Sequence, residues 1–132
     1  TIHLQGGRDM IQAANEAKGD TKILGVSLLT SLDDSDTREL YNNDFKKQFD
    51  NLINLAMETE IDGIVCSSQE LELIKDTSLI KVVPGIRNQH TFDDQKRVMT
   101  SGEAYSKGAD YIVVGRPITQ AKDIEQAIKD YS

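Results

Sequence analysis

Short apolar stretches alternate along the chain with longer segments in which apolar residues recur every three or four positions. The short stretches cover residues 2–4, 22–27, 63–66, 80–83 and 111–114. They are apolar at successive positions, which is typical of strands in a parallel sheet that is buried on both faces. The pattern therefore predicts five strands.

Amphipathic segments between these stretches predict helices. Three of them carry apolar residues at the spacing of one helical face: Met10, Ala13, Ala14 and Ala17; Phe45, Phe49, Leu52, Ile53 and Ala56; Ile124, Ala127, Ile128 and Tyr131. Ser67 with Glu70 and Thr100 with Glu103 have the spacing of a capping box, which predicts two further helix starts.

The predicted order is strand then helix, five times, and right-handed crossovers make this a parallel α/β arrangement. Five units in 132 residues is about 26 residues per unit, and eight such units would need roughly 210 residues, the lower end for a (β/α)₈ TIM barrel. An open five-stranded sheet would leave two exposed edges, which proteins usually avoid. We therefore expect residues 1–132 to be part of one TIM-barrel domain and to hold about five βα units.

Composition narrows the class of protein. The net charge of −7 argues against a nucleic-acid partner, because phosphate backbones are bound by clustered Lys and Arg. No apolar run is long enough to span a membrane, and the first residues lack the features of a signal peptide. The single cysteine, Cys66, fits a reducing cytoplasm. The chain begins with Thr1 inside an apolar run, which we interpret as the start of a fragment.

The first candidate for chemistry is Gly115-Arg116, directly after the last predicted strand. Glycine lets a ligand approach the backbone, and the two N–H groups together with a guanidinium could grip an anion such as phosphate. In TIM barrels, phosphate often sits near the loops after strands 7 and 8. A plain turn with a surface arginine explains these residues equally well.

Two other strand ends carry polar candidates. Pro84-Gly85-Ile86-Arg87 follows the fourth strand and opens a long connection that contains Gln95, whose amide could bind a polar ligand. Thr30 and Ser31 follow the second strand, where their hydroxyls could bond a base edge. Ordinary turn or capping roles are the favoured interpretation of Pro84-Gly85 and of Thr30-Ser31 taken alone.

Other reactive residue types lack partners in the sequence. No paired carboxylates, no Ser-His-Asp set and no zinc-ligand spacing is evident. The acidic run at 33–36 is best explained as the solvated start of a helix, and Cys66 as a core thiol. We therefore expect no metal, and we assign no catalytic residue.

Six pieces of the chain together resemble the orotidine 5′-phosphate decarboxylase family. In order they are His3-Leu4-Gln5-Gly6-Gly7, residues 24–31, Gly63-Ile64-Val65-Cys66-Ser67, Pro84-Gly85-Ile86-Arg87, Asp94-Gln95-Lys96-Arg97-Val98 and residues 108–118. A lone Gly-Arg-Pro is weak evidence, whereas six pieces in one order, each at a predicted strand end, are highly specific.

The resemblance implies a (β/α)₈ barrel of which this chain forms strands 4 to 8. It implies a carbon-carbon lyase that converts orotidine 5′-monophosphate to UMP and CO₂ in pyrimidine biosynthesis, without a cofactor, as a cytoplasmic homodimer. The substrate-binding residues that it implies are Thr30, Ser31, Pro84, Arg87, Gln95, Gly115 and Arg116. The family's catalytic Asp-x-Lys-x-x-Asp motif would lie upstream of Thr1, so the chain alone is expected to be inactive.

The sequence departs from the family's usual pattern in the connection after Arg87. The family often has proline where this chain has Asn88, and Thr-Pro where it has Thr100-Ser101. Two alternatives stay open on the sequence. One is another phosphate-binding barrel of the same superfamily, such as a metal-dependent sugar-phosphate synthase or an epimerase; the other is a non-catalytic nucleotide-phosphate-binding module.

Overall fold

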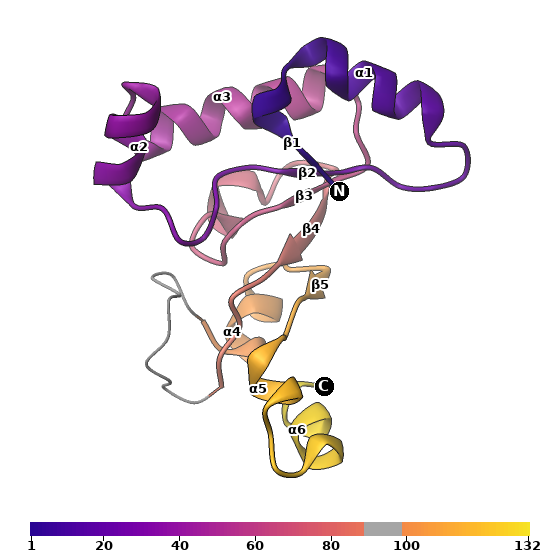
Figure 1. Cartoon of the computed structure of the whole chain (residues 1–132), viewed down its shortest axis with the longest axis vertical. Coiled ribbons are helices and arrows are strands. Elements are labelled where there is room, and N and C mark those ends of the chain that lie inside the picture. Colours follow the sequence, from indigo (N-terminus) through magenta and orange to yellow (C-terminus); the bar gives the residue numbers. More distant parts are fainter. Residues whose placement is uncertain (89–98) are drawn as a thin grey trace.

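The computed structural model describes residues 1–88 and 99–132. Its strands are β1 (Ile2–His3), β2 (Leu24–Val26), β3 (Gly63–Val65), β4 (Ile80–Val83) and β5 (Tyr111–Ile112). Its helices are α1 (Arg8–Ala17), α2 (Asp34–Tyr41), α3 (Phe45–Glu58), α4 (Ser101–Ser106), α5 (Arg116–Thr119) and α6 (Ile124–Tyr131), with 3₁₀ helices η1 (Leu4–Gly6) and η2 (Leu71–Ile74). Figure 1 shows α1 to α3 at one end of the molecule and α5 and α6 at the other. No helix in the described ranges is long and apolar enough to cross a bilayer.

All five strands lie in one parallel sheet, and each pairs with the strand next to it in the chain, in the order β1-β2-β3-β4-β5. The five predicted strands and their parallel arrangement are thus confirmed. Only β4 has its predicted bounds; the other four strands are shorter than predicted, β2 and β5 by two residues or more. Consecutive parallel strands joined by helices in this order are the arrangement of a (β/α)₈ barrel.

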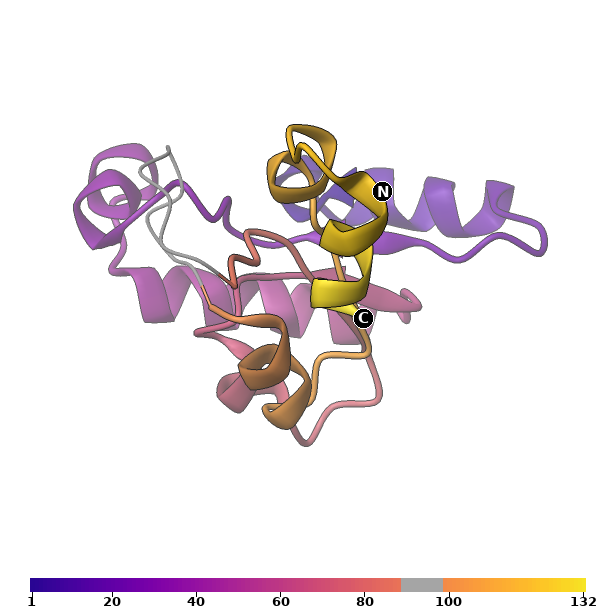
Figure 2. The same cartoon turned by 90° about the horizontal axis from the view of Figure 1, so that it is seen from below.

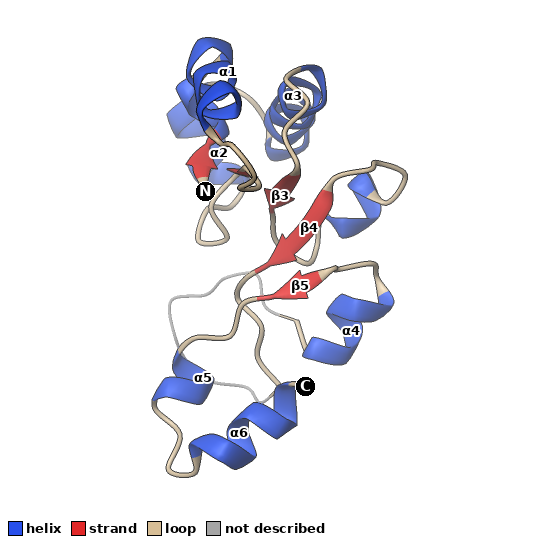
Figure 3. Cartoon of the chain, turned by 90° about the vertical axis from the view of Figure 1, so that its right-hand side faces the viewer, coloured by secondary structure: helices blue, strands red, loops and turns tan. Residues whose placement is uncertain are grey.

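The two faces of the sheet differ in burial. Gly25, Ile64 and Lys81 are in register across β2, β3 and β4, and all three are buried beneath the helices. The neighbouring row on the opposite face runs through Val26, Val65, Val82 and Tyr111, and ends with a Tyr111 side chain that is 62% exposed. The expectation that both faces are buried is therefore wrong for this structure, because the described helices cover only one face (Figure 3).

The core lies between the sheet and the helices of its covered face. The predicted stripe on α3 is confirmed, since Phe49, Leu52, Ile53 and Ala56 are buried. The predicted stripe on α1 is wrong by one position: Met10 is exposed, and Ile11 is the buried residue of that helix. Alanine carries too little apolar surface to decide which side of a helix turns inward, so the larger Ile11 side chain prevails.

The two predicted capping boxes have different outcomes. Thr100 and Glu103 form a complete capping box at the start of α4. Ser67 and Glu70 do bond to each other, with the Ser67 N–H and Oγ–H both donating to the Glu70 carboxylate at 2.7 and 2.6 Å. However, the helix that follows them is only the 3₁₀ helix η2, so the prediction of an α-helix there is wrong.

Helix α6 closes the lower end of the molecule together with α5, as the view from below shows (Figure 2). The predicted stripe on α6 is only partly buried: Ala127 is buried and Tyr131 packs against the core. Ile124 and Ile128 are each about half exposed.

Aspartates at the amino ends of two strands tie neighbouring strands together. Asp62, just before β3, accepts hydrogen bonds from the Ile23 N–H and the Lys18 ammonium, both at 2.7 Å. These bonds, with that of Lys18 the larger cause, hold the pKa of Asp62 below its ordinary value. Asp110, just before β5, accepts from the Lys81 N–H of β4 at 2.7 Å.

Candidate functional site at the carboxyl edge of the sheet

Because the strands are parallel, their carboxyl ends meet at one edge of the sheet. Hydrogen bonds connect successive strands at this edge: Gln5 Nε2 donates to the Ser27 carbonyl at 2.8 Å, and Ser27 Oγ donates to the Val65 carbonyl at 3.0 Å. Further along, the Cys66 N–H donates to the Val82 carbonyl and the Val113 N–H to the Val83 carbonyl. This edge is where parallel α/β folds bind their ligands.

The turn after β5 is open toward this edge. Gly115 precedes the short helix α5, and its carbonyl accepts from the N–H groups of Ile118 and Thr119 at 2.9 and 3.0 Å. A Cβ atom added to Gly115 would meet no described atom within 4 Å. Arg116 is the first residue of α5 and is exposed. A ligand could therefore reach both the Gly115 backbone and the Arg116 side chain.

The segment after β4 is enclosed instead. Pro84 is half-buried, and Gly85 adopts a φ of +75°, a conformation that favours glycine. Arg87 is only 8% exposed, and its Nη1 donates to the Ile86 carbonyl at 2.8 Å. A buried arginine is costly unless its donors are satisfied. The Arg87 side chain is thus fixed inside the protein, whereas Arg116 lies on the surface.

Of the remaining predicted site residues, Thr30 and Ser31 lie in the loop after β2. Thr30 is half-buried and Ser31 exposed, in a turn closed by the Leu32 N–H donating to the Leu29 carbonyl at 3.0 Å. The turn that was the favoured interpretation of these two residues is confirmed. Gln95 lies outside the described residues.

Carboxylates occupy the part of the edge beside β2 and β3. A hollow of about 560 Å³ there is lined by Leu32, Asp33, Asp34, Phe45, Gln69, Glu70 and Leu73. Asp33 caps α2, as the sequence predicted for the acidic run, and hydrogen bonds from the Phe45 N–H and from Arg38 keep the pKa of Asp34 below its ordinary value. Negative charge makes this hollow unsuitable for a phosphate, whereas the exposed Arg116 after β5 suits an anion.

Sequence reasoning missed two polar features of this edge. Glu70 is 2% exposed with a buried carboxylate, although its type and spacing suggested only a helix cap. Asn88 makes three hydrogen bonds to segments far along the chain, and no local pattern could have indicated them. Among the described residues, no three His, Cys, Asp or Glu side chains gather as a metal-ion site would require.

Comparison with known proteins identifies the family to which the chain belongs. Residues 1–131 match the model of the orotidine 5′-phosphate decarboxylase / HUMPS family. The chain belongs to this family. The family match thus extends over all five βα units.

Curated relatives of the family are similar over nearly the whole chain. Orotidine 5′-phosphate decarboxylase of Aquifex aeolicus is 43% identical over 139 residues, covering 98% of this chain and 60% of that protein. Its counterpart from Ehrlichia chaffeensis is 42% identical over 137 residues, with 98% and 59% coverage. The chain thus spans about 60% of the length of these relatives.

Solved structures of the family share the fold. The orotidine 5′-phosphate decarboxylase from Lactobacillus acidophilus superimposes with a TM-score of 0.78 at 28% identity, covering 99% of this chain and 63% of that one. The enzyme from Pyrococcus horikoshii gives a TM-score of 0.71 at 26% identity, with 97% and 56% coverage. The expected α/β barrel architecture, present here as five βα units, is confirmed.

Proposed function

We propose that the full-length gene product containing this chain converts orotidine 5′-monophosphate to UMP and CO₂. The observation that carries the proposal is the family match over residues 1–131, together with relatives about 43% identical that are named for this activity. In this proposal the chain supplies the part of the enzyme that binds the phosphate and the pyrimidine.

The phosphate group is assigned to Gly115 and Arg116. Support comes from the open approach to the Gly115 backbone and the exposed Arg116 guanidinium at the carboxyl edge. A guanidinium can form two parallel charge-assisted hydrogen bonds to a phosphate. The acidic hollow beside β2 and β3 disfavours that part of the edge for an anion.

The other family positions complete the proposed site. Thr30 and Ser31 would lie beside the pyrimidine, Pro84 near its carboxylate, and Arg87 and Gln95 in the connection that borders phosphate and base. Thr30, Pro84 and Arg87 follow the carboxyl ends of β2 and β4, at the same edge as Arg116. One ligand that spans this edge could therefore lie beside Thr30, Pro84, Arg87 and Arg116.

We further propose that the chain corresponds to strands 4 to 8 of the barrel. Five consecutive parallel strands and coverage of about 60% of the relatives support this assignment. The lysine that protonates C6 of the pyrimidine and its carboxylate neighbours would then belong to the preceding units. A cytoplasmic homodimer is part of the same proposal. Its support is the family resemblance and, for the cytoplasm, the single cysteine of the chain, which fits a reducing compartment.

The proposed mechanism needs no cofactor. Loss of CO₂ leaves a carbanion at C6, which a positioned ammonium stabilises and then protonates. Contacts to the phosphate, remote from the reacting carbon, hold the substrate and contribute the binding energy that the chemical step uses. This chain's residues would supply those remote contacts.

The test is an absorbance assay of orotidine 5′-monophosphate decarboxylation by the full-length gene product, with and without EDTA. We expect turnover that EDTA leaves unchanged. Mg²⁺-dependent turnover of a sugar phosphate, with none of orotidine 5′-monophosphate, would instead establish the sugar-phosphate synthase alternative. Binding of UMP without any turnover would establish a nucleotide-binding module.

A further inference from the structure

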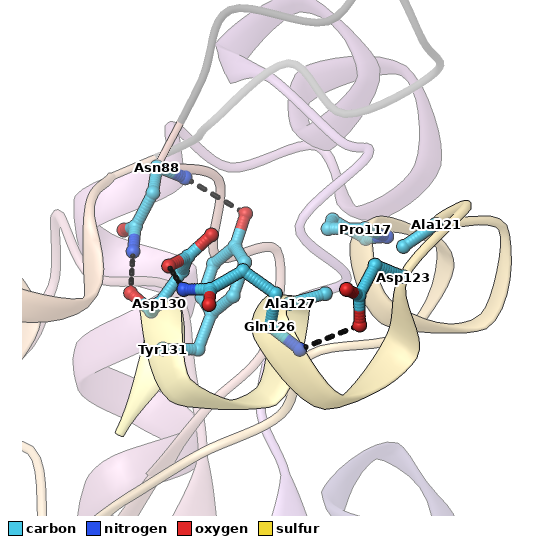
Figure 4. A pocket seen from close by; sticks show the side chains of 8 residues that line it. All are labelled: Asn88, Pro117, Ala121, Asp123, Gln126, Ala127, Asp130 and Tyr131. Atoms are coloured by element: carbon cyan, nitrogen blue, oxygen red, sulfur yellow. Dashed lines mark hydrogen bonds between the residues drawn. The ribbon is translucent and has the colours of Figure 1, made fainter.

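Asn88 links three segments that are distant in the sequence. Its backbone N–H donates to the Tyr131 hydroxyl at 3.0 Å, and its Nδ2 donates to the Asp130 carbonyl at 2.6 Å, both at the end of α6 (Figure 4). Its Oδ1 accepts from the Ser101 N–H at 2.8 Å, at the start of α4. One side chain and its peptide thus join the segment after β4 to both helices.

These bonds act on the neighbouring Arg87. The N–H of Asn88 belongs to the same rigid peptide plane as the carbonyl of Arg87, so the Tyr131 hydroxyl fixes that plane. On the other side, the Arg87 N–H donates to the Met99 carbonyl at 2.9 Å, and Ile86 forms a parallel bridge with Met99. The backbone of Arg87 is therefore held from both sides.

Helix α6 also contacts the segment that carries Arg116. Helix α5, which begins at Arg116, packs against α6. A cavity of about 320 Å³ is lined by Pro117 and Ala121 on that side, by Asn88, and by five residues of α6 and its cap: Asp123, Gln126, Ala127, Asp130 and Tyr131. The segment that carries Arg87 and the segment that carries Arg116 thus both contact α6 (Figure 4).

We propose that Asn88 and Tyr131 are positioning residues, which set Arg87 relative to Arg116 through α6. The inference rests on the proposed function, in which both arginines contact one phosphorylated ligand. In this proposal, Asn88 and Tyr131 act by fixing the backbone that presents Arg87, rather than by binding the ligand themselves.

The first experiment measures UMP binding by calorimetry to the full-length gene product and its Tyr131→Phe variant. This substitution removes only the oxygen that accepts from Asn88, so we expect the Kd for UMP to rise roughly three- to tenfold, as loss of one hydrogen bond implies. Asn88→Ala, which removes two other bonds of the same link, should act in the same direction. Tyr105→Phe, on an exposed tyrosine of α4, is the matched control and should leave the Kd unchanged.

A double-mutant cycle with Arg87→Ala separates positioning from general loss of structure. If Tyr131 acts through Arg87, adding Tyr131→Phe to Arg87→Ala should change the Kd by less than twofold. Additive effects would overturn the inference, and so would an unchanged Kd in both single variants, whatever their melting temperatures. Failure of the unsubstituted protein to bind UMP would refute the proposed function itself, and the inference with it.

Discussion

Asp62 provides a quantitative test of how the sheet is held at its amino edge. Its Oδ2 accepts from Lys18 Nζ and from the Ile23 N–H, each at 2.7 Å, and the two charged side chains are only 23% and 24% exposed. Asp62→Asn keeps the shape and one neutral acceptor but removes the charge. A hydrogen bond to a charged group contributes about 1.5–3 kcal/mol and a neutral one about 1 kcal/mol, so we expect a loss of about 1–2 kcal/mol in unfolding free energy at pH 7.

The pH dependence follows from the direction of the pKa shift. The pKa of Asp62 is lower in the folded protein than its ordinary value of 3.8, chiefly because of the Lys18 hydrogen bond. The carboxylate therefore contributes its full stabilisation above that ordinary value, and the contribution is lost as the pH falls through the folded-state pKa. The difference between the parent protein and Asp62→Asn should shrink accordingly in acid.

Urea denaturation of the full-length gene product at a series of pH values measures this difference. Asp50→Asn is the matched control, because Asp50 pairs with Lys46 on the exposed face of α3 and should contribute far less. A difference between parent and Asp62→Asn that stays constant down to acid pH would refute the electrostatic explanation. Equal stability of the two proteins at pH 7 would refute the role of Asp62 altogether.

Three further predictions concern the proposed ligand site and the chain itself. Arg116→Ala should weaken binding of UMP by roughly 2–4 kcal/mol while leaving uridine binding unchanged, as calorimetry with both ligands would show; Arg38→Ala is the control for loss of an exposed charge. Gln95→Ala should lower kcat/KM without lowering the melting temperature, and the opposite pattern would identify Gln95 as a structural residue. Residues 1–132 expressed alone should self-associate in sedimentation, because an apolar sheet face that includes Tyr111 and Val113 is uncovered. They should also show no decarboxylation, so a monomer with turnover would contradict both expectations.

Strand positions and the main packing helix could be predicted because their signals are local and strong. Consecutive apolar residues identified all five strands, and two phenylalanines with three aliphatic residues marked the buried face of α3. The stripe on α1 was displaced by one residue because three of its four predicted members are alanines, which barely distinguish one helix side from another. β5 was overestimated because the apolar residues Val113 and Val114 continue past the end of the regular strand. β2 was overestimated at both ends, by Lys22 and Ile23 before it and Ser27 after it.

The candidate site was only partly predictable for a different reason. Glycine, proline and arginine at strand ends indicate where a ligand can approach, and on that ground Gly115, Arg116 and Pro84 are candidates whose ligand contacts stay predictions. The partners of Asn88 lie 13, 42 and 43 residues away, and a single polar residue in a connection carries no sign of such contacts. The burial of Glu70 likewise depends on how the loops after β2 and β3 pack, which no spacing of residues reports.

The strand order has a consequence for biosynthesis. Within residues 1–88 and 99–132, each strand of this sheet pairs with the strand next to it in the sequence. As the ribosome releases the chain from its N-terminus, each new strand finds its partner already made, so the sheet can grow in the order of translation. At each stage from β1 to β5 the newest strand presents one edge to the next βα unit. In a closed barrel only the final pairing, of the last strand with the first, joins segments that are far apart in the sequence.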